Sequence, residues 1–311
     1  MPTTREALLP TGAQHEIAYG DQRAVVTEVG ATLRAYEVAG TPVIDGFAAD
    51  ERSSAGRGQV LAPWPNRLED GRYTYAGMDG SAALDEPERG NAIHGLVRWL
   101  PWTLDLRTDE AVVLRCTLHP QPGYPWLLDV AVRYAVGPGG LEVEADATNR
   151  SDVPAPFGIG FHPYVTVGTE RIDDAHLQVP AGEQLAADER GLPTGRHALI
   201  GSDADFISPR PVGATRLDTA FTGLLRDKVG RAIAVLQRPD EGRAVRVWVD
   251  DSFRYLMVYT GDTLEPAERR RAAVAIEPMT CPPNALRTGV DLIELEPGAT
   301  WRGTWGISPE R

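Results

Sequence analysis

The sequence has 311 residues, of which 42% are hydrophobic and 24% charged, the composition of a globular protein with enough apolar residues for a large core. Its formal net charge of −13 argues against nucleic acid or an anionic membrane as the main partner, because both require a basic surface. No basic-then-apolar leader opens the sequence, no apolar run approaches the ~20 residues that span a bilayer, and the two cysteines, Cys116 and Cys281, form no CxxC pattern. We therefore expect a cytoplasmic protein.

Residues 61–77 form the first segment with a distinctive pattern, in which two prolines and a tryptophan precede Arg67. Prolines restrict the backbone, and the letters EDGRY that follow are typical of a tight turn. The pattern predicts a rigid loop that ends in a hairpin turn at residues 69–73. Arg67 on such a loop could pair with a carboxylate, or it could bind ligand oxygens with its planar fork of donors.

Much of the remaining chain predicts short β-strands. Each segment is rich in Val, Leu, Tyr or Trp and is bounded by Gly, Pro, Asp or Asn. The glycine-rich connection between the predicted strands at residues 127–136 and 141–149 is typical of a hairpin. The clearest predicted strands are residues 111–118, 127–136, 141–149, 244–251, 254–260 and 292–307.

Two segments depart from this pattern. Residues 180–221 predict a loop-dominated region, and long loops on a β scaffold often carry function. Residues 266–273 predict at most one or two helical turns. Taken with the strands, these features predict a single all-β domain over residues 1–311, a large antiparallel β-sandwich or barrel-like stack of sheets.

Glu277 stands at the end of an apolar run. Val274 and Ile276 alternate with small residues in the order typical of a half-buried strand. The same alternation places Glu277 on one face with Ala273 and Ala275. Small neighbours leave space beside a carboxylate, which is costly to bury unpaired. Glu277 is therefore either a strand-end charge that reaches solvent or a group that lines a cavity and acts chemically.

Two of the six histidines have unusual neighbours. His94 is followed by Gly95, which permits the close approach of a ligand or of another backbone segment. His162 is preceded by Gly160 and followed by Pro163, which favours an extended conformation at His162. The other four histidines are expected at the surface, namely His15, His119, His176 and His197.

Asp218, in the letters RLDTAF, could cap a turn or accept hydrogen bonds from a ligand hydroxyl. Taken singly, each of these polar residues is better explained by a structural role than by a functional one. The sequence contains no GxxxxGK[ST], no GxGxxG between strand and helix, no HExxH and no GxSxG. Nucleotide binding and covalent serine catalysis therefore have little support.

The sequence contains five motifs in order: PNRLEDGRYTYAG, NAIHGLVRW, GFHPYV, LDTAF and AIEPMTCPPNAL. This series resembles the aldose 1-epimerase (galactose mutarotase) family. The resemblance covers nearly the whole chain, from residues 27–46 to the closing LEPGATWRGTWGI. It implies a large β-sandwich, the interconversion of the α and β anomers of a hexose, and no cofactor or metal. The expected partner is a small-molecule sugar, bound by a monomer or a homodimer.

By this resemblance, Glu277 is the general base and His162 is the general acid. His94 belongs to the same catalytic set and, with Arg67 and Asp218, binds sugar oxygens. An acid–base pair suits this reaction, because a base must take the O1 proton while an acid protonates the ring oxygen. Aromatic residues that could pack against the sugar ring are Trp64, Phe221 and Tyr164.

Two positions depart from the family pattern. Val165 stands where an aromatic residue follows His-Pro-Tyr, and Leu96 stands where a second glycine often follows His-Gly. Both are adjacent to proposed site residues, so the identity of the sugar is left open. The alternatives are a hexose-6-phosphate 1-epimerase, a non-catalytic carbohydrate-binding protein, a glycosidase that uses Glu277 with Asp218, and a two-histidine, one-carboxylate metal site.

Overall fold

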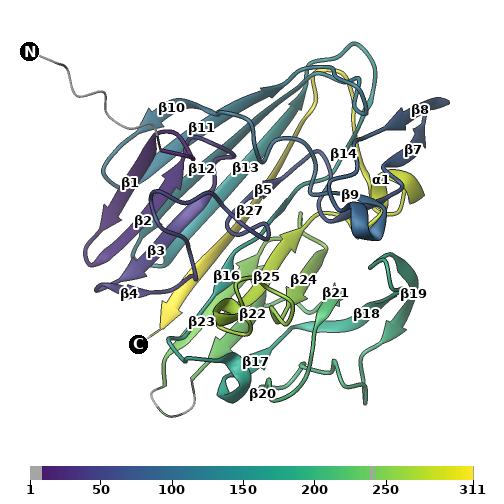
Figure 1. Ribbon diagram of the computed structural model, residues 1–311. Helices are drawn as coiled ribbons and strands as arrows, with labels where there is room; N and C mark the ends of the chain where they lie inside the picture. Colours follow the sequence, from purple (N-terminus) through teal and green to yellow (C-terminus); the bar gives the residue numbers. More distant parts are fainter. Residues whose placement is uncertain (1–8, 239, 241, 311) are drawn as a thin grey trace, which may run out of the picture.

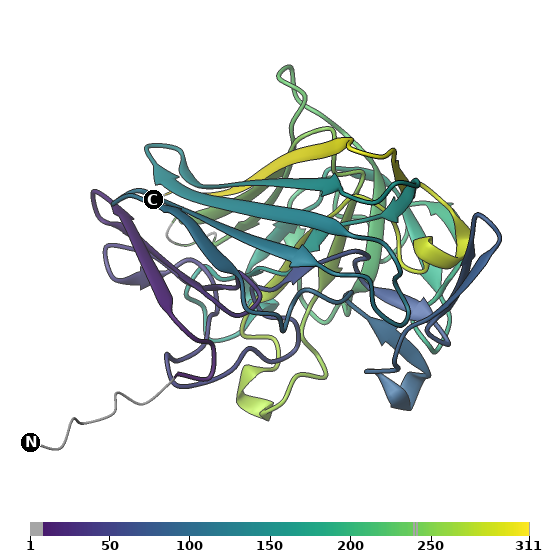
Figure 2. The same cartoon turned by 90° about the horizontal axis from the view of Figure 1, so that it is seen from above.

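The structure is a computed structural model, and it describes residues 9–238, 240 and 242–310. The chain forms an antiparallel β-sandwich in which two large sheets share one core (Figures 1 and 2). The all-β prediction is therefore confirmed. Within the described residues the helical elements are short: η1 (Pro87–Arg89), η2 (Ile172–Asp174), η3 (Ala267–Arg269) and α1 (Ala285–Thr288).

A nine-stranded sheet forms one layer of the sandwich, and Figure 2 shows its long teal and yellow strands running side by side. Alternating burial along its long strands shows why their sequences alternate, since one face packs on the core. The predicted hairpin is confirmed, with Gly137 paired to Gly140 at the turn. In spatial order the strands are β10 (Thr103–Arg107), β11 (Ala111–Leu118), β12 (Leu128–Gly137), β13 (Gly140–Asn149), β27 (Thr300–Glu310), β23 (Ala244–Val249), β22 (Ala232–Gln237), β17 (His176–Gln178) and β20 (Arg210–Pro211).

An eight-stranded sheet forms much of the opposite layer. Its strand β25 pairs with β24 on one side and with both β15 and β16 on the other. In spatial order the strands are β19 (Pro193–Ala198), β18 (Ala181–Ala187), β21 (Asp218–Leu224), β24 (Tyr255–Tyr259), β25 (Val274–Met279), β15 (Gly160–Phe161) and β5 (Val60–Leu61), with β16 (Tyr164–Val165) beside β25.

Smaller sheets complete the structure. The N-terminal sheet, purple in Figure 1, comprises β1 (Gln14–Tyr19), β2 (Gln22–Thr27), β3 (Leu33–Val38) and β4 (Thr41–Pro42). The three two-stranded pairs are β14 (Ala155–Phe157) with β26 (Ile293–Leu295), β6 (Arg67–Glu69) with β9 (Asn91–Ile93), and β7 (Arg72–Tyr75) with β8 (Met78–Ser81).

Aromatic side chains join the two large sheets. The ring centroid of Phe161 on β15 lies 5.1 Å from that of Trp305 on β27 and 6.2 Å from that of Phe253. All three side chains are buried. Burying a side chain of this size stabilises the fold by about 1.5–3 kcal/mol. These contacts fix β15, and therefore the residues that follow it, against the opposite sheet.

The prediction of a loop-dominated region over residues 180–221 is right for residues 199–217, whose one strand is the two-residue β20, but it missed the strands on either side. The structure has two long strands there, β18 and β19, which form a hairpin, and β21 begins at Asp218. The two hairpin strands lie at the edge of the sheet and are mostly half-buried or exposed. Because neither face is fully covered, their sequences lack the apolar alternation that marks a strand. Here the pattern was absent although the strand is present.

Two other predicted elements differ in detail. The turn at Asp70 and Gly71 exists, but it does not join a hairpin, because β6 pairs with β9 and β7 pairs with β8. Residues 292–307 form two strands in different sheets rather than one, since β26 pairs with β14 and β27 joins the nine-stranded sheet. The predicted short helical segment is confirmed as the single turn of η3.

The strand that carries Glu277 is buried on both faces, so the prediction of a half-buried strand was wrong. Ala273 and Ala275 pack in a small apolar cluster with Tyr164 and Leu264, which occupy the space that the small residues leave. Pairing also continues past Glu277 to Met279. In the part of the chain that the structure describes, none of the helices is long and apolar enough to cross a membrane.

Candidate active site

Glu277 lies in the middle of the eight-stranded sheet. It is paired with Met257 on β24, and only 2% of its surface is exposed. Strands on both sides of β25 hold its backbone, so the backbone position from which the Glu277 side chain extends is fixed. A carboxylate in such a place is costly to bury without a partner. Its partner comes from the neighbouring pair of strands.

His162 connects β15 to β16 and lies beside Glu277. Its Nε2 atom is 3.3 Å from Oε1 of Glu277, and both side chains are buried. Its backbone N–H donates to the carbonyl of Gln59, and its carbonyl accepts from the N–H of Gly58. A Cβ atom at Gly56 would lie 2.4 Å from Cδ2 of His162, so this backbone packs directly on the imidazole. The imidazole is therefore held on several sides.

His94 reaches the same place from the turn after β9. Its backbone is left-handed, with φ of 66°, and Asn66 has φ of 57°. The N–H of Asn66 donates to Nδ1 of His94 at 3.2 Å, which places the proton of a neutral His94 on Nε2. The His94 ring meets the His162 ring edge-on, with centroids 5.3 Å apart. Gly95 is packed against the backbone of Ala62, so its role in the structure is close backbone approach.

Arg67, at the start of β6, is held by two carboxylates. Its Nε atom donates to Oε2 of Glu86 at 3.0 Å and its Nη2 atom to Oε1 of Glu86 at 3.2 Å. Asp218 lies on the other side, with Oδ2 at 3.5 Å from Nη2 of Arg67. The side chain of Arg67 is 9% exposed, whereas that of Asp218 is 40% exposed. The two residues therefore connect the buried part of the site to solvent.

Burial controls the proton affinities of the central groups. It raises the pKa of Glu277 well above its usual value, to which the carboxylate of Asp218 adds, while Arg67 opposes the change. Burial lowers the pKa of His162 to about 3, and the positive charge of Arg57 acts in the same direction. The pKa of His94 also falls well below its usual value, chiefly through burial. Each group prefers its neutral form because the charged form loses its hydration.

Glu277 and His162 each keep one polar atom without a hydrogen-bond partner among the described residues. These atoms are Oε2 of Glu277 and Nδ1 of His162, and both are buried. Buried polar atoms in native proteins are nearly always hydrogen-bonded, so exceptions require an explanation. A carboxylate oxygen with open acceptor positions beside an imidazole is suited to accept a proton from a bound hydroxyl group.

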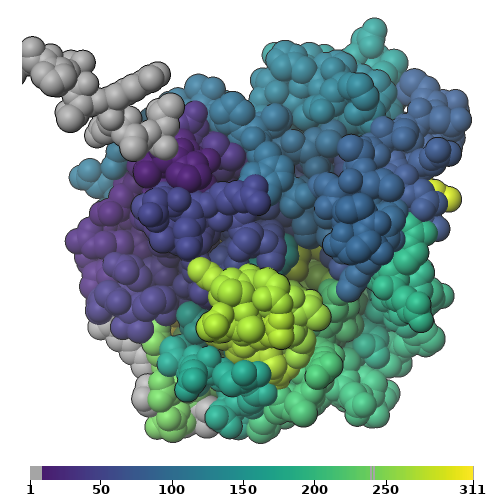
Figure 3. Space-filling model, in the orientation of Figure 1, coloured from purple at the N-terminus to yellow at the C-terminus, as the bar shows by residue number. Residues whose placement is uncertain are grey.

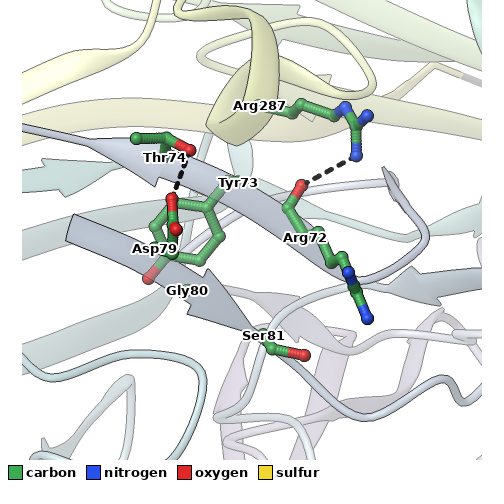
Figure 4. A pocket seen from close by; sticks show the side chains of 7 residues that line it. All are labelled: Arg72, Tyr73, Thr74, Asp79, Gly80, Ser81 and Arg287. Carbon is green, nitrogen blue, oxygen red and sulfur yellow. Dashed lines mark hydrogen bonds between the residues drawn. The ribbon is translucent and has the colours of Figure 1, made fainter. Parts of the chain in front are cut away.

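The surface is hollowed beside Asp218. Figure 3 shows a recess between the blue segment that contains η1 and the yellow-green segment that contains η3. A groove of about 370 Å³ lies beside Asp218 and is lined by η1 and the β18–β19 hairpin, including Arg89, Gln184 and Asp188. A separate hollow of about 560 Å³ between the β7–β8 hairpin and Arg287 shares no lining residue with the candidate site (Figure 4).

The other predicted residues have mixed outcomes. Tyr164 stacks on His162, with ring centroids 5.0 Å apart, whereas Phe221 is fully buried in the main core. Trp64 is also a core residue. The prediction of a surface position for His15 was wrong, since it is 8% exposed. Its strand packs one face on the core, and a histidine on that face is covered.

No set of three or more His, Cys, Asp or Glu residues within the described ranges is arranged to hold a metal ion. His94 and His162 do lie together with Glu277, as the metal alternative requires. However, Nδ1 of His94 already accepts a hydrogen bond, and Nε2 of His162 contacts Glu277. Both cysteines, Cys116 and Cys281, are buried and free.

A family model described as aldose 1-epimerase matches residues 15–308 of the chain. The chain belongs to the aldose 1-epimerase family. The uncharacterised protein YihR of Escherichia coli K12 is 33% identical to it over 302 residues, which is 97% of this chain and 94% of YihR. The family resemblance that the five motifs predicted is thereby confirmed.

Solved structures show the same fold at lower identity. The GalM/aldose epimerase homologue from Caenorhabditis elegans has a TM-score of 0.85 at 19% identity and covers 96% of this chain and 99% of its own. The galactose 1-epimerase from Lactobacillus acidophilus NCFM has a TM-score of 0.77 at 21% identity and covers 94% of this chain and 92% of its own. This aldose 1-epimerase family member therefore has the fold of those two proteins.

Sequence reasoning missed two groups that the structure places around the predicted residues. Glu86 accepts a hydrogen bond from Arg67, and Arg57 packs on the ring of Tyr164. Glu86 lies in a polar stretch, DEPERG, that has no periodicity to mark it. Arg57 is one of many arginines and lies in a loop. Only the tertiary structure brings these two side chains to the site.

Proposed function

We propose that the protein is an aldose 1-epimerase that interconverts the α and β anomers of a free hexose. Glu277 and His162 act as the proton-transfer pair. The observation that carries this proposal is their 3.3 Å contact between Nε2 and Oε1, made by two buried groups that each keep a further polar atom without a partner among the described residues. Pure carbohydrate binding would not require a buried acid–base pair, whereas ring opening does.

In the proposed reaction, the carboxylate of Glu277 takes the proton from the O1 hydroxyl group. The electrons of that O–H bond form the C1=O1 double bond, the C1–O5 bond breaks, and O5 takes a proton from His162. Rotation about the C1–C2 bond presents the other face of the aldehyde. Ring closure then reverses both proton transfers, so that Glu277 and His162 return to their starting states and nothing else is consumed.

The burial of the pair determines where its shared proton lies. Because the pKa of Glu277 is raised and that of His162 is lowered, the neutral pair of carboxylic acid and imidazole is favoured over the ion pair. At rest the proton is therefore on Glu277. It crosses to His162 before ring opening begins. Ring opening then converts the charged pair back into the neutral pair that the buried surroundings favour. A positioned proton donor or acceptor of this kind contributes about 10²–10⁴-fold in rate.

The proposed sugar-binding groups are His94, Arg67 and Asp218. His94 keeps its Nε2 proton for donation, because its Nδ1 atom is engaged by Asn66. Arg67 is oriented by its bidentate bond with Glu86, and Asp218 supplies a partly exposed acceptor at the rim. Hydrogen-bond donors and acceptors gathered at one site suit a ligand with several neighbouring hydroxyl groups.

Mutarotation of freshly dissolved sugars tests the proposal. Pure α-glucose and α-galactose are followed by proton NMR with and without the protein, and the spontaneous rate is subtracted. We expect the protein to accelerate the approach to anomeric equilibrium for at least one free hexose. The panel includes hexose 6-phosphates and an aryl glycoside. Acceleration confined to the phosphorylated sugars would contradict the free-hexose substrate, and release of the aryl group or the absence of any acceleration would contradict the epimerase assignment.

A further inference from the structure

Arg57 is a buried arginine close to the proton-transfer pair that the proposed reaction does not use. Its side chain is 2% exposed, and its Nη2 atom forms an ion pair with Asp45 at 3.0 Å. A buried guanidinium is retained only where its charge is paired or stacked. Its guanidinium carbon lies 4.5 Å from the centre of the Tyr164 ring, the geometry of a cation–π contact.

Tyr164 connects Arg57 to His162. The rings of Tyr164 and His162 are nearly parallel, with an interplanar angle of 18° and centroids 5.0 Å apart. The hydroxyl group of Tyr164 donates to the carbonyl of Ala55 at 3.1 Å, which fixes the tilt of the ring. Arg57 and His162 therefore both pack on the ring of Tyr164. We refer to these three residues as the His162 stack.

The loop that carries Arg57 also holds the backbone of His162. The hydrogen bonds of Gly58 and Gln59 with His162, and the close approach of Gly56 to its ring, come from this same loop. The carbonyl of Arg57 accepts a hydrogen bond from the hydroxyl group of Ser53 at 2.8 Å. One short segment thus positions both the backbone and the imidazole plane of the proposed acid.

We propose that Tyr164 and Arg57 are positioning residues for the proposed acid, with Tyr164 fixing the plane of the His162 imidazole and Arg57 making the imidazolium a stronger proton donor. The inference rests on the proposed role of His162. A positive charge behind the stacked ring repels a second positive charge on His162, so protonated His162 releases its proton more readily. A stronger acid transfers its proton more readily to the weakly basic ring oxygen of the sugar.

The other groups around His162 do not replace this effect. Glu277 faces it from β25, and His94 meets it from the turn after β9. Arg98 contributes a weaker repulsion than Arg57 does. Asp45 forms ion pairs with both Arg57 and Arg269, so its one negative charge is divided between two arginines.

The first test measures His162 directly and needs no activity. The imidazole resonance of His162, assigned by comparison with His162→Gln, is titrated by NMR in the wild-type protein and in Arg57→Met and Arg57→Lys. We expect wild-type His162 to remain neutral until about pH 3. In Arg57→Met the midpoint should rise by about one unit, the effect of removing one charge at this range in a partly polarisable interior. Arg57→Lys should remain near the wild-type value.

An unchanged midpoint in Arg57→Met, or an equal rise in Arg57→Lys, would overturn the electrostatic part of the proposal. This readout does not depend on sugar turnover, so its failure is separate from a failure of the proposed function. Circular dichroism at each pH shows that the variants are folded.

The second test uses Tyr164 and remains decisive if Arg57→Met does not fold. Tyr164→Phe keeps the stacked ring and loses only the hydrogen bond to Ala55, so kcat should stay within about twofold of wild type. Tyr164→Leu removes the ring, and kcat for mutarotation should fall at least about tenfold while KM stays within about twofold. Wild-type kcat in Tyr164→Leu, or an equal loss in Tyr164→Phe, would overturn the positioning role of the ring.

Discussion

The two parts of the candidate site are built on different physical principles. The proposed proton-transfer part, His162 and Glu277, is buried, and each residue keeps a polar atom without a partner among the described residues. The proposed binding part, Arg67 with Glu86 and Asp218, is joined by charge-assisted contacts and extends to a side chain that is 40% exposed.

This difference separates the proposed binding residues from the proposed proton-transfer pair by the charge state that each prefers. Burial shifts the pKa values of His162 and Glu277 toward their neutral forms. For Arg67, burial lowers the pKa, but the carboxylates of Asp218 and Glu86 outweigh it and the net change is upward. Arg67 is thus kept charged, whereas His162 and Glu277 are kept neutral. The predictions below test this division.

The largest effect should come from Glu277→Gln. The amide has the shape of the carboxyl group but cannot accept the O1 proton, so kcat for mutarotation should fall by about 10²–10⁴-fold with little change in KM. The measurement is proton NMR of anomer exchange. Glu183→Gln is a matched control, because Glu183 is an exposed carboxylate on β18 of the same sheet that pairs with Arg196. Activity near wild type in Glu277→Gln would remove Glu277 as the base.

A smaller effect, on binding rather than on chemistry, should come from Arg67→Lys. Lysine keeps the charge but loses the planar fork that meets both oxygens of Glu86. We expect KM to rise about tenfold with kcat within about threefold of wild type. Glu86→Gln should raise KM in the same direction by less. Steady-state mutarotation kinetics separate the two constants, and a loss in kcat alone would place Arg67 in the chemical part instead.

The pH dependence should show a wide active range. The active state of the pair holds one shared proton. A second proton binds when His162 titrates near pH 3, and the shared proton is lost when Glu277 titrates well above its usual pKa. An unperturbed pair would instead lose activity below about pH 4.5, where the carboxylate takes its proton. We therefore expect kcat/KM at about pH 4 to be within twofold of its plateau, after subtraction of the acid-catalysed background. A tenfold fall between pH 5 and 4 would contradict the shared-proton state.

The smallest effect should appear in stability. Because the folded-state pKa of Glu277 is raised by burial, the stability that this group contributes is present below its unfolded pKa and is lost as the pH rises through the folded value. Glutamine cannot ionise and avoids that loss. The Tm of Glu277→Gln should therefore exceed that of the wild type at alkaline pH, and the difference should shrink as the pH falls. Thermal unfolding followed by circular dichroism measures it, and a difference that does not depend on pH would show that Glu277 is not held in its neutral form.

Periodicity succeeded where a strand packs one face on the core. The strands β11, β12 and β13 were predicted within about a residue, because their inward side chains form an apolar series and glycines mark the turn. It failed for β18 and β19, whose edge position leaves both faces partly open. It also misjudged β25, because a strand buried on both faces can still alternate large and small residues.

By itself, the sequence determined the fold class, the family and the residue types that a sugar epimerase needs, because these depend on local alternation and on short motifs whose order is visible along the chain. The tertiary structure alone decided that Nε2 of His162 lies 3.3 Å from Oε1 of Glu277, that Glu86 accepts a hydrogen bond from Arg67, and that Arg57 packs on the ring of Tyr164. These contacts join segments distant in sequence. Strand pairing and burial create them, and burial then sets the proton affinities on which the proposed chemistry depends.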